Sequence, residues 1–362
     1  MKKAALRLVY LCGFLILMQL MTFCIKSIKN DSSEPGIEPQ IDGWEIKSID
    51  FNINVDLRKF LFINPSTGYI IGLNGAIYFT TDSGNTWQSQ SSGTTLHLNS
   101  VSFLNENIGF ISGRGSSGCL DPDCNKGSFL LRTSDGGHHW NKVFYDSLAY
   151  LESMQFRDIE HGIAVMEYYQ RSNEKNKFLV KTDDGGTTWN KTEIDIPQTT
   201  PATLINVQDV YYLIGSNHTI LKSIDYGNTW QSYATPITES NDIQDMYFIN
   251  KDIGFITGGI YSYKTTNGAA TWQKVNDQIS WFHGVHFYND LEGFGFDIAM
   301  VYEGGDFPVF KGTYIYTTND GGITWHRSDL YREIAIGYTS FPNPGIGYSL
   351  IGSKLYRFIK KG

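Results

Sequence analysis

One phrase, Ser/Thr-x-Asp-x-Gly-x-Thr-Trp, recurs six times with small variations along this chain of 362 residues. The six tryptophans that end the copies are 41 to 53 residues apart. A period of this size is typical of propellers and solenoids, in which one supersecondary unit cannot bury its own apolar face and must stack on further copies. The defining pairs are Asp82 and Trp87, Asp135 and Trp140, Asp184 and Trp189, Asp225 and Trp230, Asn267 and Trp272, and Asp320 and Trp325.

Each phrase is expected to form a hairpin turn, because Asp accepts backbone N–H groups and Gly allows positive φ. A β-rich run such as 76–79 precedes the turn, and the tryptophan begins another, such as 87–90. Farther upstream lie an apolar strand such as 100–103 and a strand that starts with Gly and an aromatic residue, such as 109–111. Four antiparallel strands joined by turns are the blade of a β-propeller.

The two ends of the array complement each other. Residues 338–358 repeat only the first three strands of a blade, whereas residues 43–49 look like a fourth strand, with Trp44, that has no hairpin before it. Pairing these segments would remove two exposed sheet edges. We therefore predict an all-β, seven-bladed β-propeller whose last blade is closed by the N-terminal strand, with a six-bladed ring as the alternative.

The phrase resembles the Asp-box, or bacterial neuraminidase repeat. Its longer form, a Gly-aromatic strand followed by Thr-x-Asp-Gly-Gly-x-Thr-Trp, resembles the photosystem II stability/assembly factor-like propellers over residues 42–360. Asn267, Ala269 and Tyr226 depart from the pattern. The resemblance implies a propeller with an assembly or scaffold role, although Asp-boxes also occur in sialidases, xyloglucan hydrolases and sorting receptors.

The net charge of −8 narrows the kinds of partner that are expected. Partner recognition in the resembled family uses a basic patch, so a photosystem role is not expected for this acidic chain. A nucleic-acid partner is not expected either, because a basic face would be needed to neutralise phosphates.

The N-terminus predicts export. Basic residues precede an uncharged run over 8–25, which is typical of a signal segment. We interpret residues 1–25 as a signal peptide or lipoprotein leader, with Cys24 as the lipidation candidate, or as an uncleaved signal anchor; residues 26–41 as a flexible tether; and residues 42–360 as the propeller. The expected location is the bacterial envelope, membrane-anchored, in the periplasm or at the cell surface.

Candidate binding residues lie between the second and third strands of a blade. This connection is long at 114–128, 167–177 and 297–311, and all three are expected to rise from the face opposite the Asp-boxes. Binding residues concentrate on such loops, whereas the Asp-box carboxylates are expected only to hold turns. The candidates, which suit a polypeptide or a carbohydrate, are Asp121, Asp123, Glu167, Tyr168, Tyr169, Arg171, Tyr302, Glu303 and Asp306.

Residues 118–127 contain two cysteines and two aspartates, which bear on disulfide and metal chemistry. Cys119 and Cys124 are predicted to form a local disulfide in an oxidising compartment, since zinc would need two further ligands. Asp121 and Asp123 resemble the start of a calcium loop, but Arg132 stands where a bidentate Glu is required. No metal and no cofactor are therefore predicted.

No catalytic residues are predicted. The chain has no N-terminal Arg-Ile-Pro segment of the sialidase kind, no Gly-x-Ser-x-Gly and no Walker loop. We predict a monomeric, non-enzymatic propeller that associates with a membrane through its N-terminus and binds an envelope protein or a surface polysaccharide. The alternative is a glycan-binding or glycoside-hydrolysing sialidase-like propeller.

Overall fold

The computed structural model describes residues 40–361, apart from 42, 51–52, 54–56, 116–126, 170–174, 193–202, 216–217, 238–242, 259–260, 276–283, 302–308, 328–337 and 352–353. They belong to the unit Gln40–Gly362. No helix within these described ranges is long and apolar enough to cross a membrane. The lipidation candidate Cys24 lies outside them.

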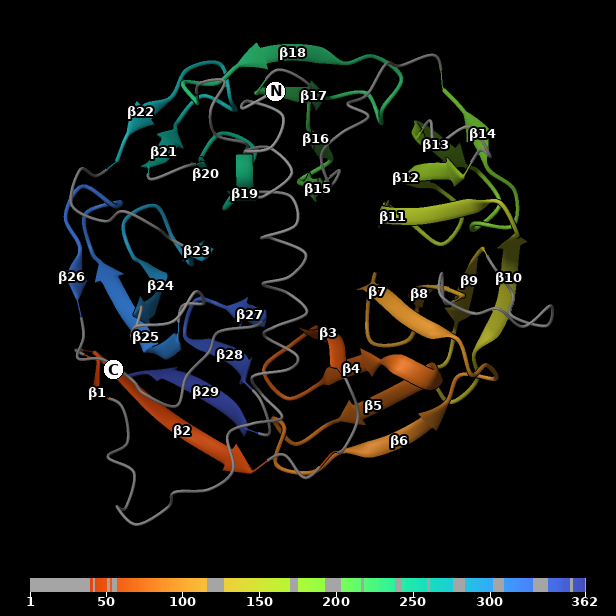
Figure 1. The fold of residues 1–362 in the computed structure, drawn as a ribbon, viewed down its shortest axis with the longest axis horizontal. Coiled ribbons are helices and arrows are strands. Elements are labelled where there is room, and N and C mark those ends of the chain that lie inside the picture. The colour runs from red at the N-terminus through yellow and green to blue at the C-terminus, as the bar shows by residue number, and fades with distance from the viewer. Residues whose placement is uncertain are drawn as a thin grey trace. The chain divides into compact units, whose positions relative to one another are not determined.

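The unit consists of seven antiparallel sheets arranged around an axis (Figure 1). Blade 1 is β3 (Leu57–Phe62), β4 (Gly68–Gly72), β5 (Ala76–Thr80) and β6 (Gln88–Ser91), with the short η1 (Leu73–Gly75). Blade 2 is β7 (His97–Phe103), β8 (Gly109–Arg114), β9 (Ser128–Thr133) and β10 (Asn141–Asp146). Blade 3 is β11 (Ala149–Phe156), β12 (Gly162–Tyr169), β13 (Lys175–Thr182) and β14 (Asn190–Lys191).

Blade 4 is β15 (Leu204–Val207), β16 (Val210–Ile214), β17 (Thr219–Ser223) and β18 (Gln231–Ala234). Blade 5 is β19 (Ile243–Phe248), β20 (Gly254–Gly258), β21 (Tyr261–Thr265) and β22 (Gln273–Lys274). Blade 6 is β23 (Gly284–Phe287), β24 (Gly293–Val301), β25 (Val309–Thr318) and β26 (His326–Arg327). Blade 7 is β27 (Tyr338–Asn343), β28 (Ile346–Ile351), β29 (Lys354–Lys360), β2 (Trp44–Asp50) and β1 (Gln40–Ile41).

Blade 7 is closed by the N-terminal strand, as predicted. β2 pairs antiparallel with β29, with Trp44 opposite Lys360. Trp44 is 3% exposed, and its ring centroid lies 4.8 Å from that of Phe294 and 5.2 Å from that of Tyr288, both on blade 6. The closing strand therefore joins two blades, and the predicted seven-bladed propeller is confirmed.

Neighbouring blades are joined by a repeated aromatic stack. Phe62, at the end of β3, stacks on Tyr348 of β28 at a centroid distance of 3.6 Å and meets Trp87 edge-on at 6.0 Å. A Cβ on Gly68 would lie 2.9 Å from the Phe62 ring, so the glycine that starts β4 leaves room for that ring. Equivalent stacks join Tyr69 to Phe103, Phe110 to Phe156, Tyr212 to Phe248, Phe255 to Phe287 and Phe294 to Phe341.

The Asp-box turns are closed by side-chain hydrogen bonds. Thr80 Oγ1 donates to Asp82 Oδ1 at 2.8 Å and accepts from Gly84 N–H at 3.1 Å, and Asp82 Oδ1 accepts from Thr86 N–H at 2.8 Å. Partial burial alone would raise the pKa of Asp82, but the hydrogen bonds from Thr86 and Thr80 lower it. The same Thr or Ser contact recurs at Asp135, Asp184, Asp225, Asn267 and Asp320.

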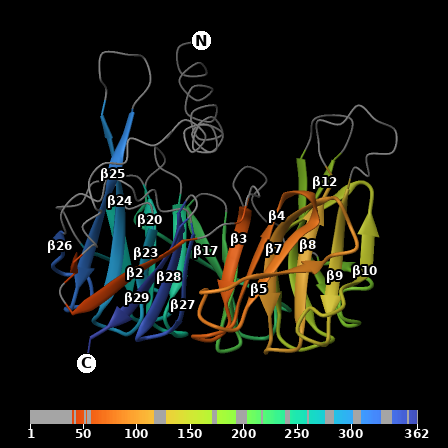
Figure 2. The ribbon, with the colours of Figure 1, turned by 90° about the horizontal axis from the view of Figure 1, so that it is seen from below.

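Two of the expected long connections are partly strand. β12 continues to Tyr169 and β13 begins at Lys175, while β24 continues to Val301 and β25 begins at Val309. In Figure 2, β24 and β25 rise above most other strands at the end opposite the Asp-boxes. The pairing of long strands therefore extends into segments where the sequence analysis placed loops.

Replacing Trp44 by Ala should destabilise the ring, because the buried indole contacts both Tyr288 and Phe294. We expect a loss of about 3–5 kcal/mol in the free energy of unfolding, measured by urea titration. Lys47→Ala, on the exposed side of the same strand, is the matched control and should change little. A W44A chain as stable as K47A would contradict the closure.

His286 should make stability depend on pH. Its ring stacks on Phe341 at 4.1 Å, and burial lowers its pKa from 6.5 to about 3. The unfolded chain therefore binds the proton first, and stability falls as pH drops from about 6.5 towards 3, by up to about 1.4 kcal/mol per unit. Relative to His286→Phe, the native chain should lose about 2 kcal/mol between pH 7.5 and 5 in urea titrations. Parallel pH curves would refute this assignment.

Candidate functional site

Three basic residues lie at the ends of strands in blades 1 and 2, on the side opposite the Asp-boxes. β3 and β7, which carry two of them, are the strands of these blades nearest the axis (Figure 1). Arg58 is exposed on β3, and His97, the first residue of β7, pairs with Arg114 at the end of β8. Burial, then the charges of Arg58 and Arg114, lower the pKa of His97. The Arg114 guanidinium lies 4.9 Å from the ring centroid of Tyr150 in blade 3. We call the two arginines and the neighbouring His97 the mouth cluster.

The predicted binding residue Glu167 lies within blade 3. It is 5% exposed, on β12, opposite Lys177 of β13, which is also 5% exposed. Lys177 Nζ lies 2.8 Å from Glu152 Oε2. Tyr168 is half-buried; burial and Asp146 raise its pKa. The structure thus places these two candidates on a strand beside blade 2, and Glu167 is largely covered.

The remaining candidates are not placed. Tyr169 belongs to β12, but its side chain is not described. The described residues contain no group of three or more His, Cys, Asp or Glu arranged to hold a metal. Outside the described ranges lie Asp121, Asp123, Arg171, Tyr302, Glu303, Asp306, Cys119 and Cys124.

A cleft of about 800 Å³ lies between blades 3 and 4, at the Asp-box end. Blade 4 departs here from blades 1, 2, 3, 5 and 6, because Asn206 and Tyr211 are paired where those blades pair a Phe with a Gly. Tyr211 is fully buried and packs against Ile163 of blade 3. The aromatic ring is therefore supplied by the second strand. The cleft is lined by Arg157, His161, Lys181, Asp183, Asp209, Tyr211, Ile224, Asp225, Tyr226 and Asn228.

The turn between β15 and β16 lowers one wall of the cleft. Gln208 and Asp209 form its two-residue tip, with φ of 52° and 64°, the conformation of a tight hairpin. In blade 3 the corresponding loop is longer, and its Glu160 carbonyl accepts a hydrogen bond from Gly185 N–H of the Asp-box at 2.8 Å. Within the described parts of blade 4, Tyr226 N–H makes no such bond, so its loop and its box are not tied together.

Tyr226 is strained. It stands where four other boxes have Gly, and it keeps the positive φ, 58°, that those glycines adopt. This conformation costs a residue with a Cβ about 1–2 kcal/mol. Its hydroxyl is buried without a hydrogen-bond partner among the described residues, and burial raises its pKa. Two unfavourable features at one residue favour a functional role for it.

Tyr226 also displaces a lysine. In blades 4 and 5, Lys222 Nζ donates to Gly268 O at 3.1 Å and Lys264 Nζ donates to Gly321 O at 3.2 Å, each across the interface to the next box. Lys181 of blade 3 instead lies over the Tyr226 ring, 4.6 Å from its centroid, and donates to Asn228 Oδ1 at 2.8 Å. The bulky Tyr226 ring occupies the space that corresponds to the path by which Lys222 and Lys264 reach their turn carbonyls.

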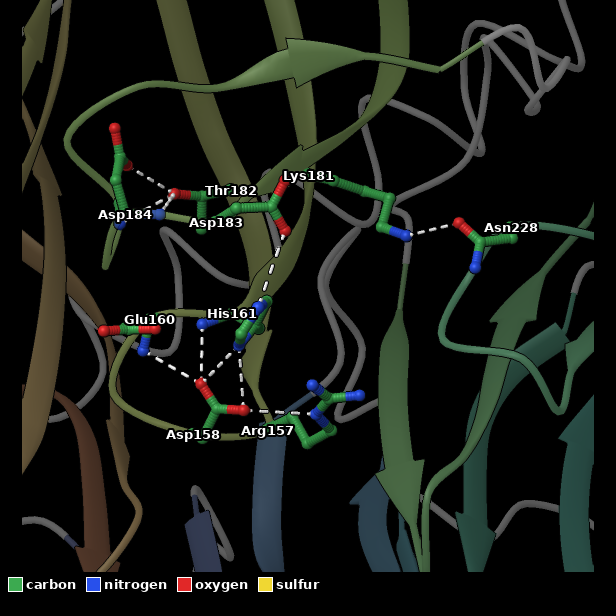
Figure 3. A network of polar contacts seen from close by, with 10 residues as sticks. Arg157, Asp158, Glu160, His161, Lys181, Thr182, Asp183, Asp184 and Asn228 are labelled. Carbon is green, nitrogen blue, oxygen red and sulfur yellow. Dashed lines mark hydrogen bonds and ion pairs between the residues drawn. The ribbon is translucent and has the colours of Figure 1, made fainter.

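A polar network forms the blade 3 side of the cleft (Figure 3). Asp158 accepts from Arg157 Nε at 3.2 Å and contacts His161 Nδ1 at 2.7 Å. Partial burial alone would raise the pKa of Asp158, but hydrogen bonds from His161, Glu160 and Arg157 lower it. The Arg157 guanidinium lies 4.3 Å from the ring centroid of Tyr226. Neither Nη of Arg157 has a hydrogen-bond partner in the described part of the chain, so both remain available to a ligand.

Neither group was predicted from the sequence. Tyr226 was identified there only as a departure from the repeat, and the signal that could have found it is a bulky residue at a position that requires positive φ. The net charge of the whole chain gave no sign of the mouth cluster, because His97 and Arg114 meet by strand pairing in blade 2 and Arg58 reaches them only from blade 1.

Comparisons with known proteins agree with this fold. A profile described as "Photosynthesis system II assembly factor YCF48" matches residues 38–151. The structure "YCF48 bound to D1 peptide" is 18% identical, with 90% of this chain and 100% of that chain covered and a TM-score of 0.65. YCF48 from Cyanidioschyzon merolae is 16% identical, with coverage of 87% and 98% and a TM-score of 0.59.

A GH74 enzyme from Niastella koreensis is 15% identical over 86% of this chain and 53% of that chain, with a TM-score of 0.60. The chain thus spans about half the length of that enzyme. The curated proteins gave no match. Identities this low show a common fold alone. The expected resemblance is confirmed: the chain is a seven-bladed Asp-box propeller similar to the photosystem II assembly factor YCF48.

Proposed function

We propose that this chain is a non-enzymatic propeller that binds a protein segment over the mouth cluster. The observation that carries the proposal is the gathering of Arg58, His97 and Arg114 at one end of blades 1 and 2 in a chain of net charge −8. The similar fold of YCF48, one structure of which is bound to a D1 peptide, supports a peptide as the kind of ligand.

The geometry suits an acidic or carbonyl-rich segment. The guanidinium of Arg114 is oriented by the Tyr150 ring, so less side-chain freedom is lost when it binds a carboxylate. A net charge of −8 disfavours anionic partners in general, so a local group of arginines favours their approach at this end of the blades. The inserted loops with Asp121, Asp123, Arg171, Tyr302, Glu303 and Asp306 belong to the same end in this proposal and would contact the partner.

The N-terminal sequence supports export and membrane anchoring, through Cys24 or a signal anchor, so the proposed partner is an envelope protein. A glycoside hydrolase is the second candidate, favoured by the fold shared with the GH74 enzyme. Against it, Glu152, a carboxylate of blade 3, is held in an ion pair 2.8 Å from Lys177 Nζ and is not free to act as an acid or base.

Charge reversal tests the proposal. Affinity capture from a membrane extract with the full-length chain should recover one specific envelope protein, and Arg58→Glu with Arg114→Glu should weaken that capture about tenfold or more, because opposite charges become like charges. Lys251→Glu, exposed at the Asp-box end, is the control and should capture normally. If the Arg58→Glu, Arg114→Glu double variant captured the protein as well as Lys251→Glu does, the proposal would be overturned. Hydrolysis of xyloglucan by the native chain would favour the second candidate instead.

A further inference from the structure

We propose that the cleft between blades 3 and 4 is a second binding site, which takes a uronic acid residue of a polysaccharide. This site is lined by residues of an Asp-box, whereas the mouth cluster lies at the opposite ends of the strands. The inference therefore does not depend on the proposed protein partner.

Arg157 is placed to bind the carboxylate. Asp158 holds the Nε side of the guanidinium at 3.2 Å, and the Tyr226 ring lies against it at 4.3 Å. The Nη groups are without partners among the described residues, and a guanidinium oriented in this way presents paired donors that match a carboxylate. Lys181, also on the Tyr226 ring, adds a second positive charge to the same wall.

The carboxylates that line the cleft indicate which groups the rest of the ligand must carry. Asp183 has a side chain 69% exposed, and Asp209 is exposed on the turn of blade 4. Such carboxylates accept hydrogen bonds from hydroxyl groups. Three aspartates line the cleft against one Arg and one Lys, so these residues sum to −1. A peptide with a carboxylate on every residue and no hydroxyl groups would leave these aspartates without donors, whereas a sugar residue with one carboxylate and several hydroxyls matches both sets of groups.

Both departures of blade 4 contribute to the hollow. The tight turn at Gln208 and Asp209 lowers the wall that a longer loop forms in blade 3, and Tyr226 removes Lys181 from the turn carbonyl. Ile224 adds an exposed apolar contact at the rim, with 75% of its area accessible. A volume of about 800 Å³ is within the range of small-ligand sites.

Calorimetry on the full-length chain tests the site with trigalacturonic acid, its methyl ester and polyglutamate. We expect trigalacturonic acid to bind, and the ester to bind at least about tenfold more weakly, because it lacks the charge that Arg157 recognises. Polyglutamate should not bind. No binding of the acid, equal binding of acid and ester, or binding of polyglutamate alone would overturn the proposal.

Three variants assign the binding to this cleft. Arg157→Met and Tyr226→Gly should each weaken trigalacturonic acid binding about tenfold or more. Tyr226→Gly restores the residue found in four other boxes, so it keeps the test valid if the first variant does not fold. Lys264→Met, which removes the corresponding lysine of blade 5, is the matched control and should bind normally. Unchanged binding in both cleft variants would place the sugar elsewhere.

Discussion

The structure depends on the packing of one aromatic ring between a glycine of its own blade and the second strand of the preceding blade. At Phe62 the ring stacks on Tyr348 at 3.6 Å, while Gly68 leaves space beneath it. Stacking of this kind adds about 0.5–1.5 kcal/mol per pair beyond the area it buries. Because a single blade has no partner for its ring, the contact stabilises only neighbouring blades, and the pairing of the N-terminal strand β2 with β29 completes the last blade of the ring.

Blade 4 departs from this packing, and its departures coincide with the cleft between blades 3 and 4. In blade 4 the ring is moved to Tyr211, the preceding turn is shortened, and Tyr226 adopts a glycine conformation. The interface remains buried through Ile163 and Tyr211, so the ring of blades is not broken. These changes lie at the Asp-box end of the blade. They leave Arg157 and Lys181 beside the cleft, and Lys181 bonds to Asn228, whereas Lys222 and Lys264 each bond to a turn carbonyl.

The fold could be predicted in full from the sequence because its signals are local and repeated. Each box carries its own turn, and the unmatched ends at Trp44 and 338–358 indicated how the ring closes. The sites were harder to predict. Arg58 and Arg114 are joined only by the ring, and the effect of Tyr226 depends on Lys181 of a different blade. Glu167 and Tyr168 were predicted from a loop pattern, but long strand pairing places them within blade 3.

The central claim is that Tyr226 displaces Lys181 from the turn and thereby forms the charged wall of the cleft. A crystal structure of the Tyr226→Gly variant tests it most directly. The account predicts that Lys181 Nζ moves to the main-chain carbonyl of residue 226, at the distance of about 3 Å that Lys222 and Lys264 keep from their turns. A lysine still bound to Asn228 Oδ1 in that variant would contradict the claim.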